Sequence, residues 1–519
     1  MRSCGVLLPV FSLPSKYGIG CFSSDAKSFI DRLAAAGQSC WQILPLSPTG
    51  PSNSPYTPRS CMAGNFLYID PETLHEKGLI TKKELSRFSS VYADFHEVSG
   101  LSEDCVDYSS LRMAKEELCM KAFRRFDKLD PEHPLKVQFR EYEKNNKKWL
   151  RDYALFMVFS AMFTDLAWTE WPEKIRRRDP DTIKKYRKKL KVGIAFYEWE
   201  QYEFFTQWRE IRNYAHSKGI LIIGDMSIYA DLESADCWAH PEFFQMTKDG
   251  RLINVAGVPP DAFAEDGQKW GNPLYDWDRL KEDGYSWWIT RIEQNYKLYD
   301  IVRLDHTLGY GSYFSIPAEK SAREGTWIKG PGMDFFNFVK ETVGDRFIAE
   351  DLGTLSPEVW QMIEDTGMPR MKVMQFAFDS DESNPFLTDN FGSNNVVYTG
   401  THDNDTSRGW YESIPDYKQN FFKWYVKTRV GDADADRITE ESAAWKMIRL
   451  AMHSKADMCI IPMQDYLNLG TEARINVPGK PSGNWRWRMK GGAFTDELCT
   501  RMAELAVEFN RKNGGRHEA

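Results

Sequence analysis

Eight short apolar runs, each followed by a turn or a polar cluster, limit most strongly how this chain can fold. Runs of this length are typical of buried parallel strands, and stretches with helical periodicity lie between most of them. Strands and helices in this alternation predict an α/β fold, a (β/α)8 TIM barrel. The predicted strands span residues 4–10, 40–46, 220–228, 300–305, 347–350, 371–376, 396–399 and 458–462.

Helical patterns are expected at residues 24–36, 282–298, 335–343, 357–366, 440–453 and 496–511. A barrel of this type needs about 250 residues, so a chain of 519 residues must carry insertions. We expect one decorated barrel over residues 1–519. The largest insertion is expected at 48–218, with a loop rich in Gly, Pro and Ser first and a helical subdomain at 109–208; a second inserted segment is expected at 229–298.

The charge balance argues against a nucleic-acid partner. Lys and Arg number 67 and Asp and Glu 75, which gives a formal net charge of −8 rather than a broad basic face. The basic run at 174–191 is interrupted by Asp179 and is interpreted as a solvated helix face. Nine scattered cysteines without a C-x-x-C pair fit reduced thiols in the cytoplasm, and neither a secretory signal nor a membrane span is expected at the N-terminus.

Four of the predicted strands deliver a carboxylate at the end where barrel enzymes build their active sites: Asp225, Asp305, Glu350 and Asp403. Any one of them could simply cap a helix or form a turn. As a group they predict a site, because each follows an apolar run and cationic or polar partners lie within two positions of an acid. Those partners are Arg303, His306 and His402.

Carboxylates that converge on one pocket suit the cleavage of glycosidic bonds, where one acid attacks and another moves protons. A third carboxylate can stabilise the positively charged transition state. The 72 aromatic residues (18 Trp, 23 Tyr, 31 Phe) are mostly core packing, although some could stack on sugars. No zinc-protease, phosphate-loop or complete dinucleotide motif is present, so neither a metal nor a cofactor is expected.

Several motifs carry a family resemblance that runs over most of the chain. They lie at residues 12–15, 17–20, 41–50, 54–56, 257–261, 267–273, 303–306, 349–353, 400–406 and 474–479. Together they resemble the 4-α-glucanotransferases called amylomaltases or disproportionating enzymes, in glycoside hydrolase family 77. The resemblance implies maltooligosaccharides and α-1,4-glucans as substrates, no cofactor, and no separate C-terminal β-domain. It does not fix the oligomeric state, and a monomer or a homodimer is expected.

The resemblance also implies roles for single residues. Asp305 resembles the nucleophile, Glu350 the general acid/base and Asp403 the transition-state stabiliser. Arg303 would orient the nucleophile, and Asp225 matches a further barrel acid. The remaining positions match sugar-binding or groove-shaping residues: Ser54, Tyr56, Gln268, Trp270, His306, His402 and Asn476.

The chain departs from the family pattern in three places. Thr307-Leu308 replaces Phe-Arg, Met226-Ser227 replaces Leu-Pro, and Ala262-Phe263 stands where two aromatics often lie on an acceptor-site loop within 229–298. These changes concern chain-length preference and loop gating, and they leave the acids intact. Two alternatives to transfer stay open: an α-amylase-like hydrolase that uses the same acids, and an inactive glucan-binding protein that has kept the barrel.

Overall fold

The computed structural model describes residues 2–511, apart from 165, 248, 261–264 and 354. Eight parallel strands close into a barrel in the order β1-β12-β11-β10-β9-β6-β3-β2. All eight predicted strands are present, so the (β/α)8 prediction is confirmed. The barrel strands are β1 (Ser3–Leu7), β2 (Cys40–Gln42), β3 (Leu221–Met226), β6 (Ile301–Leu304), β9 (Phe347–Ala349), β10 (Arg370–Val373), β11 (Asn395–Tyr398) and β12 (Met458–Pro462).

The first and last strands close the barrel through β1. Gly5 of β1 is in register with Cys40 of β2 on one side and with Ile460 of β12 on the other. A Cβ atom on Gly5 would lie 2.5 Å from the carbonyl oxygen of Cys40, so only glycine fits here. Buried side chains from the strands, among them Ile223, Ile348 and Met371, pack into one cluster, as in the filled interior of such barrels.

Helices surround the barrel, and those predicted from the sequence are found with small shifts, except at one place. The helix predicted at 282–298 is α12 (Ser286–Leu298), which begins later than expected, and a short helix that was not predicted, α11 (Trp277–Glu282), precedes it. Gly284 (φ 65°) and Tyr285 (φ 52°) are both left-handed, which a continuous α-helix cannot accommodate. The other outer helices predicted are α1 (Ser24–Ala35), α14 (Gly332–Val343), α15 (Pro357–Thr366), α18 (Glu440–His453) and α20 (Asp496–Glu508).

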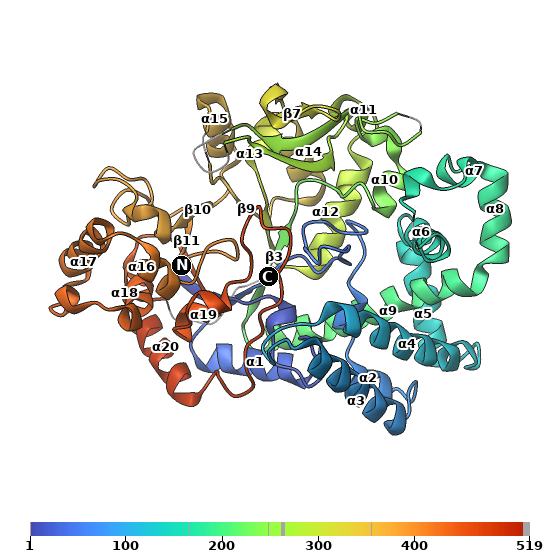
Figure 1. Ribbon diagram of the computed structural model, residues 1–519, viewed down its shortest axis with the longest axis horizontal. Coiled ribbons are helices and arrows are strands. Elements are labelled where there is room, and N and C mark those ends of the chain that lie inside the picture. Colours follow the sequence, from blue (N-terminus) through green and yellow to red (C-terminus); the bar gives the residue numbers. More distant parts are fainter. Residues whose placement is uncertain (1, 165, 248, 261–264, 354, 512–519) are drawn as a thin grey trace.

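The helical insertion between β2 and β3 gathers on one side of the barrel, at the right of Figure 1. Helix formation starts earlier than the predicted residue 109, because Asp70 caps α2 and Thr81 forms a capping box with Glu84 at the start of α3. The last inserted helix, α9 (Lys191–Ser217), packs against α1, and the ring of its Trp208 contacts the ring of Trp41. The inserted helices are α2 (Pro71–Glu76), α3 (Lys82–Ser99), α4 (Tyr108–Asp127), α5 (Pro134–Asn146), α6 (Leu150–Met162), α7 (Glu173–Arg176), α8 (Pro180–Lys189) and α9 (Lys191–Ser217).

A second sheet, which the sequence analysis did not predict, has the order β5-β4-β7-β8. Its strands are short and lack apolar alternation, so pairing between distant segments rather than local pattern forms them. They are β4 (Asn254–Val258), β5 (Gln268–Pro273), β7 (Ser312–Pro317) and β8 (Thr326–Lys329). The sheet is antiparallel, and its β5 carries Trp270 to within ring contact of His306, just beyond the end of β6.

The remaining helices are α10 (Ala235–Ala239), α13 (Leu308–Gly311), α16 (Ser407–Ser413), α17 (Asp416–Val430) and α19 (Met463–Tyr466). In the described part of the chain no strand follows β12. Of the helices described, none has both the length and the apolar character needed to cross a bilayer.

Candidate active site

Arg303 joins two of the predicted acids at the end of the barrel strands. It lies on β6 beside Asp225 of β3, and its Nη1 is 2.7 Å from Asp225 Oδ2 and 3.1 Å from Asp305 Oδ1. Asp225 and Arg303 are almost fully buried, whereas the Asp305 side chain is 27% exposed. The buried guanidinium of Arg303 therefore binds one oxygen of the Asp305 carboxylate, while part of that side chain remains exposed to solvent and accessible to a substrate.

Glu350 lies directly after β9 and is held by two backbone N–H groups. His306 N donates to Oε2 at 2.7 Å, and Leu352 N donates to Oε1 at 2.8 Å. His306 directly follows Asp305 in the sequence. The backbone N–H that holds Glu350 therefore belongs to the residue next to Asp305, the other predicted catalytic carboxylate. Burial, with a smaller contribution from the negative charge of Asp305, raises the pKa of Glu350 to about 7, against the opposing effect of Arg303.

Tyr56 brings the loop after β2 into this cluster. Its hydroxyl donates to Asp225 Oδ2 at 2.9 Å and lies 2.9 Å from Nε2 of His402. A hydroxyl has one proton, so His402 must donate from Nε2, which assigns the tautomer of this imidazole. The rings of Tyr56 and His402 stack at 5.2 Å with an interplanar angle of 15°.

Asp403 lies on the loop after β11, and its side chain is 42% exposed. Its Oδ1 accepts a 2.6 Å hydrogen bond from Nδ2 of Asn476, and its Oδ2 is 3.4 Å from Nε2 of His402. Asn476 also donates its backbone N–H to the carbonyl of His402 at 3.1 Å. The segment around Asn476 thus holds the third predicted acid in place.

Trp270 and Gln268 approach the site from the second sheet. Trp270 is 39% exposed, and its ring meets His306 edge to face at 5.3 Å. Its Nε1 donates to Oε1 of Gln268 at 3.2 Å. An exposed indole beside the acids offers a flat apolar surface to a sugar ring. Burial lowers the pKa of His306, so its imidazole tends to be neutral.

Ser54 is not among the described contacts of the acids. Its hydroxyl instead accepts the backbone N–H of Tyr56 at 3.2 Å and so shapes the loop that presents the tyrosine. The predicted acceptor-loop pair Ala262-Phe263 lies outside the described residues. All other predicted site residues are connected to the cluster through the contacts above.

The sequence analysis missed two residues that support the site. Arg474 donates to the backbone carbonyl of Asp403, and Trp485 packs on the rings of Tyr56 and His402 at 5.8 and 5.9 Å. Arg474 stands two positions before Asn476, within a motif that was noticed. Trp485 has a left-handed backbone (φ 65°), which no sequence pattern indicates for a tryptophan.

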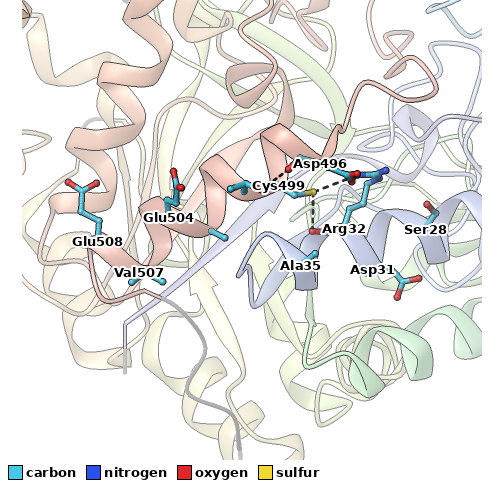
Figure 2. Close-up of a pocket in the computed structure, with 11 residues that line it drawn as sticks. Ser28, Asp31, Arg32, Ala35, Asp496, Cys499, Glu504, Val507 and Glu508 are labelled. Atoms are coloured by element: carbon cyan, nitrogen blue, oxygen red, sulfur yellow. Dashed lines mark hydrogen bonds and ion pairs between the residues drawn. The ribbon is translucent and has the colours of Figure 1, made fainter.

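Two other observations bear on the chemistry. In the described residues no group of His, Cys, Asp and Glu is arranged to hold a metal ion. A groove of about 1030 Å³ between α1 and α20 lies on the outer wall of the barrel (Figure 2). An ion pair between Arg32 and Asp496 (2.9 Å) crosses it, and none of the predicted site residues line it.

Known proteins match this chain over almost its whole length. Residues 8–495 match the family model of glycoside hydrolase family 77, described as 4-alpha-glucanotransferase. The 4-alpha-glucanotransferase of Clostridium butyricum is 42% identical, over 97% of this chain and 99% of that protein. That of Thermus thermophilus is 40% identical, over 98% and 99%. The structure of an amylomaltase from Streptococcus agalactiae in complex with acarbose matches with a TM-score of 0.92 and 35% identity, over 99% of this chain and 100% of that one.

Proposed function

This chain belongs to the 4-α-glucanotransferase family of glycoside hydrolase family 77 and is a 4-α-glucanotransferase, and we propose that Asp305, Glu350 and Asp403 carry out its reaction in two displacements. The observation that carries this mechanism is the connection between Asp305 and Glu350. Asp305 is held by the guanidinium of Arg303, and Glu350 beside it has a pKa raised to about 7. Two neighbouring carboxyl groups with different environments can take different roles.

In the first displacement, Glu350 protonates the oxygen that bridges two glucose units of an α-1,4-glucan. The carboxylate of Asp305 attacks the anomeric carbon, the bond to that oxygen breaks, and the leaving chain departs with a free 4-hydroxyl. The donor segment is then esterified to Asp305 in the β configuration.

In the second displacement, Glu350 is a carboxylate and accepts the proton of the 4-hydroxyl of an acceptor glucan or glucose. The acceptor oxygen attacks the anomeric carbon, the ester to Asp305 breaks, and an α-1,4 bond is restored. A pKa of about 7 suits both steps, because Glu350 must give a proton and take one back at the same pH.

Asp403 and the histidines act on the sugar at the cleavage point. Both displacements pass through a transition state with positive charge on the ring, which a nearby carboxylate stabilises. The half-exposed carboxylate of Asp403, fixed by Asn476, suits this role. We propose that His402 and His306 bind sugar hydroxyls and that Trp270 stacks on the acceptor, which the contacts of His402 with Tyr56 and of Trp270 with His306 beside the acids support.

We also propose a setting for the enzyme. Maltooligosaccharides and α-1,4-glucans would be both donor and acceptor, and the protein would be a monomer or a homodimer in the cytoplasm. The buried cysteines form no disulfide in the described part of the chain, which fits a reducing compartment.

Incubation of the purified protein with maltotriose separates the alternatives. Transfer predicts a ladder of longer maltooligosaccharides together with glucose. A hydrolase would give only shorter products and a steady rise in reducing ends, and an inactive glucan-binding protein would leave maltotriose unchanged. Either of the last two results would refute the proposed reaction.

A further inference from the structure

Asp403 is the least anchored of the three proposed catalytic acids. It lies five residues beyond the end of β11, outside the ladder of the barrel, and it is the most exposed of the three. A carboxylate on a loop can stabilise a transition state only if its direction is fixed before the substrate arrives. The structure must therefore hold Asp403 by other contacts.

Those contacts come from residues 474–476. Asn476 fixes the Asp403 side chain through Nδ2 and the preceding carbonyl, that of His402, through its own backbone N–H. Arg474 completes the clamp, since its Nη2 donates to the carbonyl of Asp403 at 2.7 Å and its Nε donates to the carbonyl of Asn476 at 2.8 Å. The guanidinium of Arg474 thus bridges the backbone carbonyls of Asp403 and Asn476.

The contacts of Arg474 indicate that it acts by holding the backbone in place and not by its positive charge. Within the described part of the chain it forms no ion pair with a carboxylate, and both of the groups that it binds are neutral carbonyls. A cation near a transition state that is itself positive is electrostatically unfavourable. The rigid planar fork of arginine, however, spans two acceptors at once, which the single ammonium of lysine cannot reproduce.

We propose that Arg474 is a positioning residue that fixes the backbone of Asp403 against Asn476 and so sets the direction of the Asp403 carboxylate. It touches neither reacting atom and acts through Asp403. The inference rests on the proposed role of Asp403 in the transition state.

The test compares R474K and R474M with the wild type on maltotriose, with melting temperature measured for each. Both variants are expected to lose about 10²-fold in kcat, because a small misplacement of a catalytic group has that effect. KM should stay within about threefold, since ground-state binding is not the function of the clamp. An R474K variant with wild-type kcat would show that charge suffices and would overturn the proposal. If R474M does not fold, R474K alone decides.

The chain offers a matched control in Arg488. Its Nη1 and Nη2 likewise bridge two backbone carbonyls, those of Ser15 at 3.0 Å and Glu103 at 2.8 Å, but it does not contact the acids. R488K should lower the melting temperature and leave kcat unchanged. If R488K lost as much kcat as R474K, a general loosening of the structure would explain both results and the proposal would fail.

A double-mutant cycle separates this inference from the proposed function. D403N alone should lose most activity; if it keeps wild-type kcat, the role of Asp403 is wrong. If D403N is impaired, adding R474M should lower the residual kcat by less than about threefold, because Arg474 acts only through Asp403. A further loss of about 10²-fold in the D403N background would show independent action and would overturn the positioning role while leaving Asp403 catalytic.

Discussion

The backbone N–H of His306 donates a 2.7 Å hydrogen bond to Oε2 of Glu350. His306 adopts a left-handed conformation with φ of 50°, which is costly for a residue with a side chain and typical of functional sites. The bond connects the ends of the neighbouring strands β6 and β9. Since Asp305 is the preceding residue, the same backbone places the proposed nucleophile beside the proposed acid.

The pH dependence of the rate should report Glu350. Its raised pKa of about 7 means that donor cleavage, which needs the protonated acid, slows as the pH rises through 7. In E350Q we expect kcat to fall by about 10²- to 10⁴-fold and the alkaline limb near pH 7 to disappear. Initial rates on maltotriose between pH 5 and 9 measure both. An unchanged alkaline limb in E350Q would assign that titration to another group.

The same pKa predicts how stability depends on pH. Folding raises the pKa of Glu350 from 4.5 to about 7, so between these values the folded protein keeps a proton that the unfolded chain releases. This contribution to stability is complete below about pH 4.5 and is lost as the pH rises through about 7. The free energy of unfolding of E350Q, measured in urea, should therefore rise relative to that of the wild type when the pH is changed from 5 to 8. An equal difference at both pH values would contradict the assignment.

Removing the hydroxyl of Tyr56 should lower both activity and stability. Y56F deletes the bridge between Asp225 and His402 and should lower the free energy of unfolding by about 1 to 2 kcal/mol. We expect kcat to fall by at least about tenfold, since both partners lose their orientation. Y411F is the control, because the hydroxyl of buried Tyr411 donates to the carbonyl of Ile438 at 3.1 Å and not to one of the acids. Equal kcat values for the two variants would argue against a role for the bridge.

Trp270 is predicted to serve the acceptor. W270A should raise KM for the acceptor by about three- to tenfold, which corresponds to the binding free energy of one aromatic contact. It should also shift the products from transfer toward hydrolysis. W327A is a matched control, because Trp327 is 53% exposed on β8 of the same sheet. Product analysis with glucose as acceptor decides; identical transfer ratios in W270A and wild type would remove Trp270 from the acceptor site.

The barrel and its acids were predictable because the information is local. Each barrel strand is a short apolar run, and Asp225, Asp305, Glu350 and Asp403 stand at or just after the ends of such runs. Parallel strands then bring these ends to one edge. The start of α12 was predicted too early, at residue 282, because the left-handed Gly284 and Tyr285 interrupt a pattern that otherwise reads as helical.

Other features depend on contacts between distant segments. Strand β5 contains Gly271 and ends at Pro273, and it forms only because β4 pairs with it. The link from Tyr56 to His402 spans 346 positions and exists only once the barrel has closed. Arg474 belongs to a recognised motif, but its hydrogen bond to Asp403 is a property of the folded loops.

A covalent intermediate on Asp305 is the central claim of the mechanism, and intact-mass and peptide mass spectrometry test it most directly. E350Q would be incubated with maltosyl fluoride, an activated donor that needs no proton to leave, and digested at low pH. A double displacement through Asp305 predicts accumulation of protein heavier by one maltosyl group, with the label on the peptide that contains Asp305 and none in D305N/E350Q. A label on another residue, or fluoride release without a covalent adduct, would contradict it.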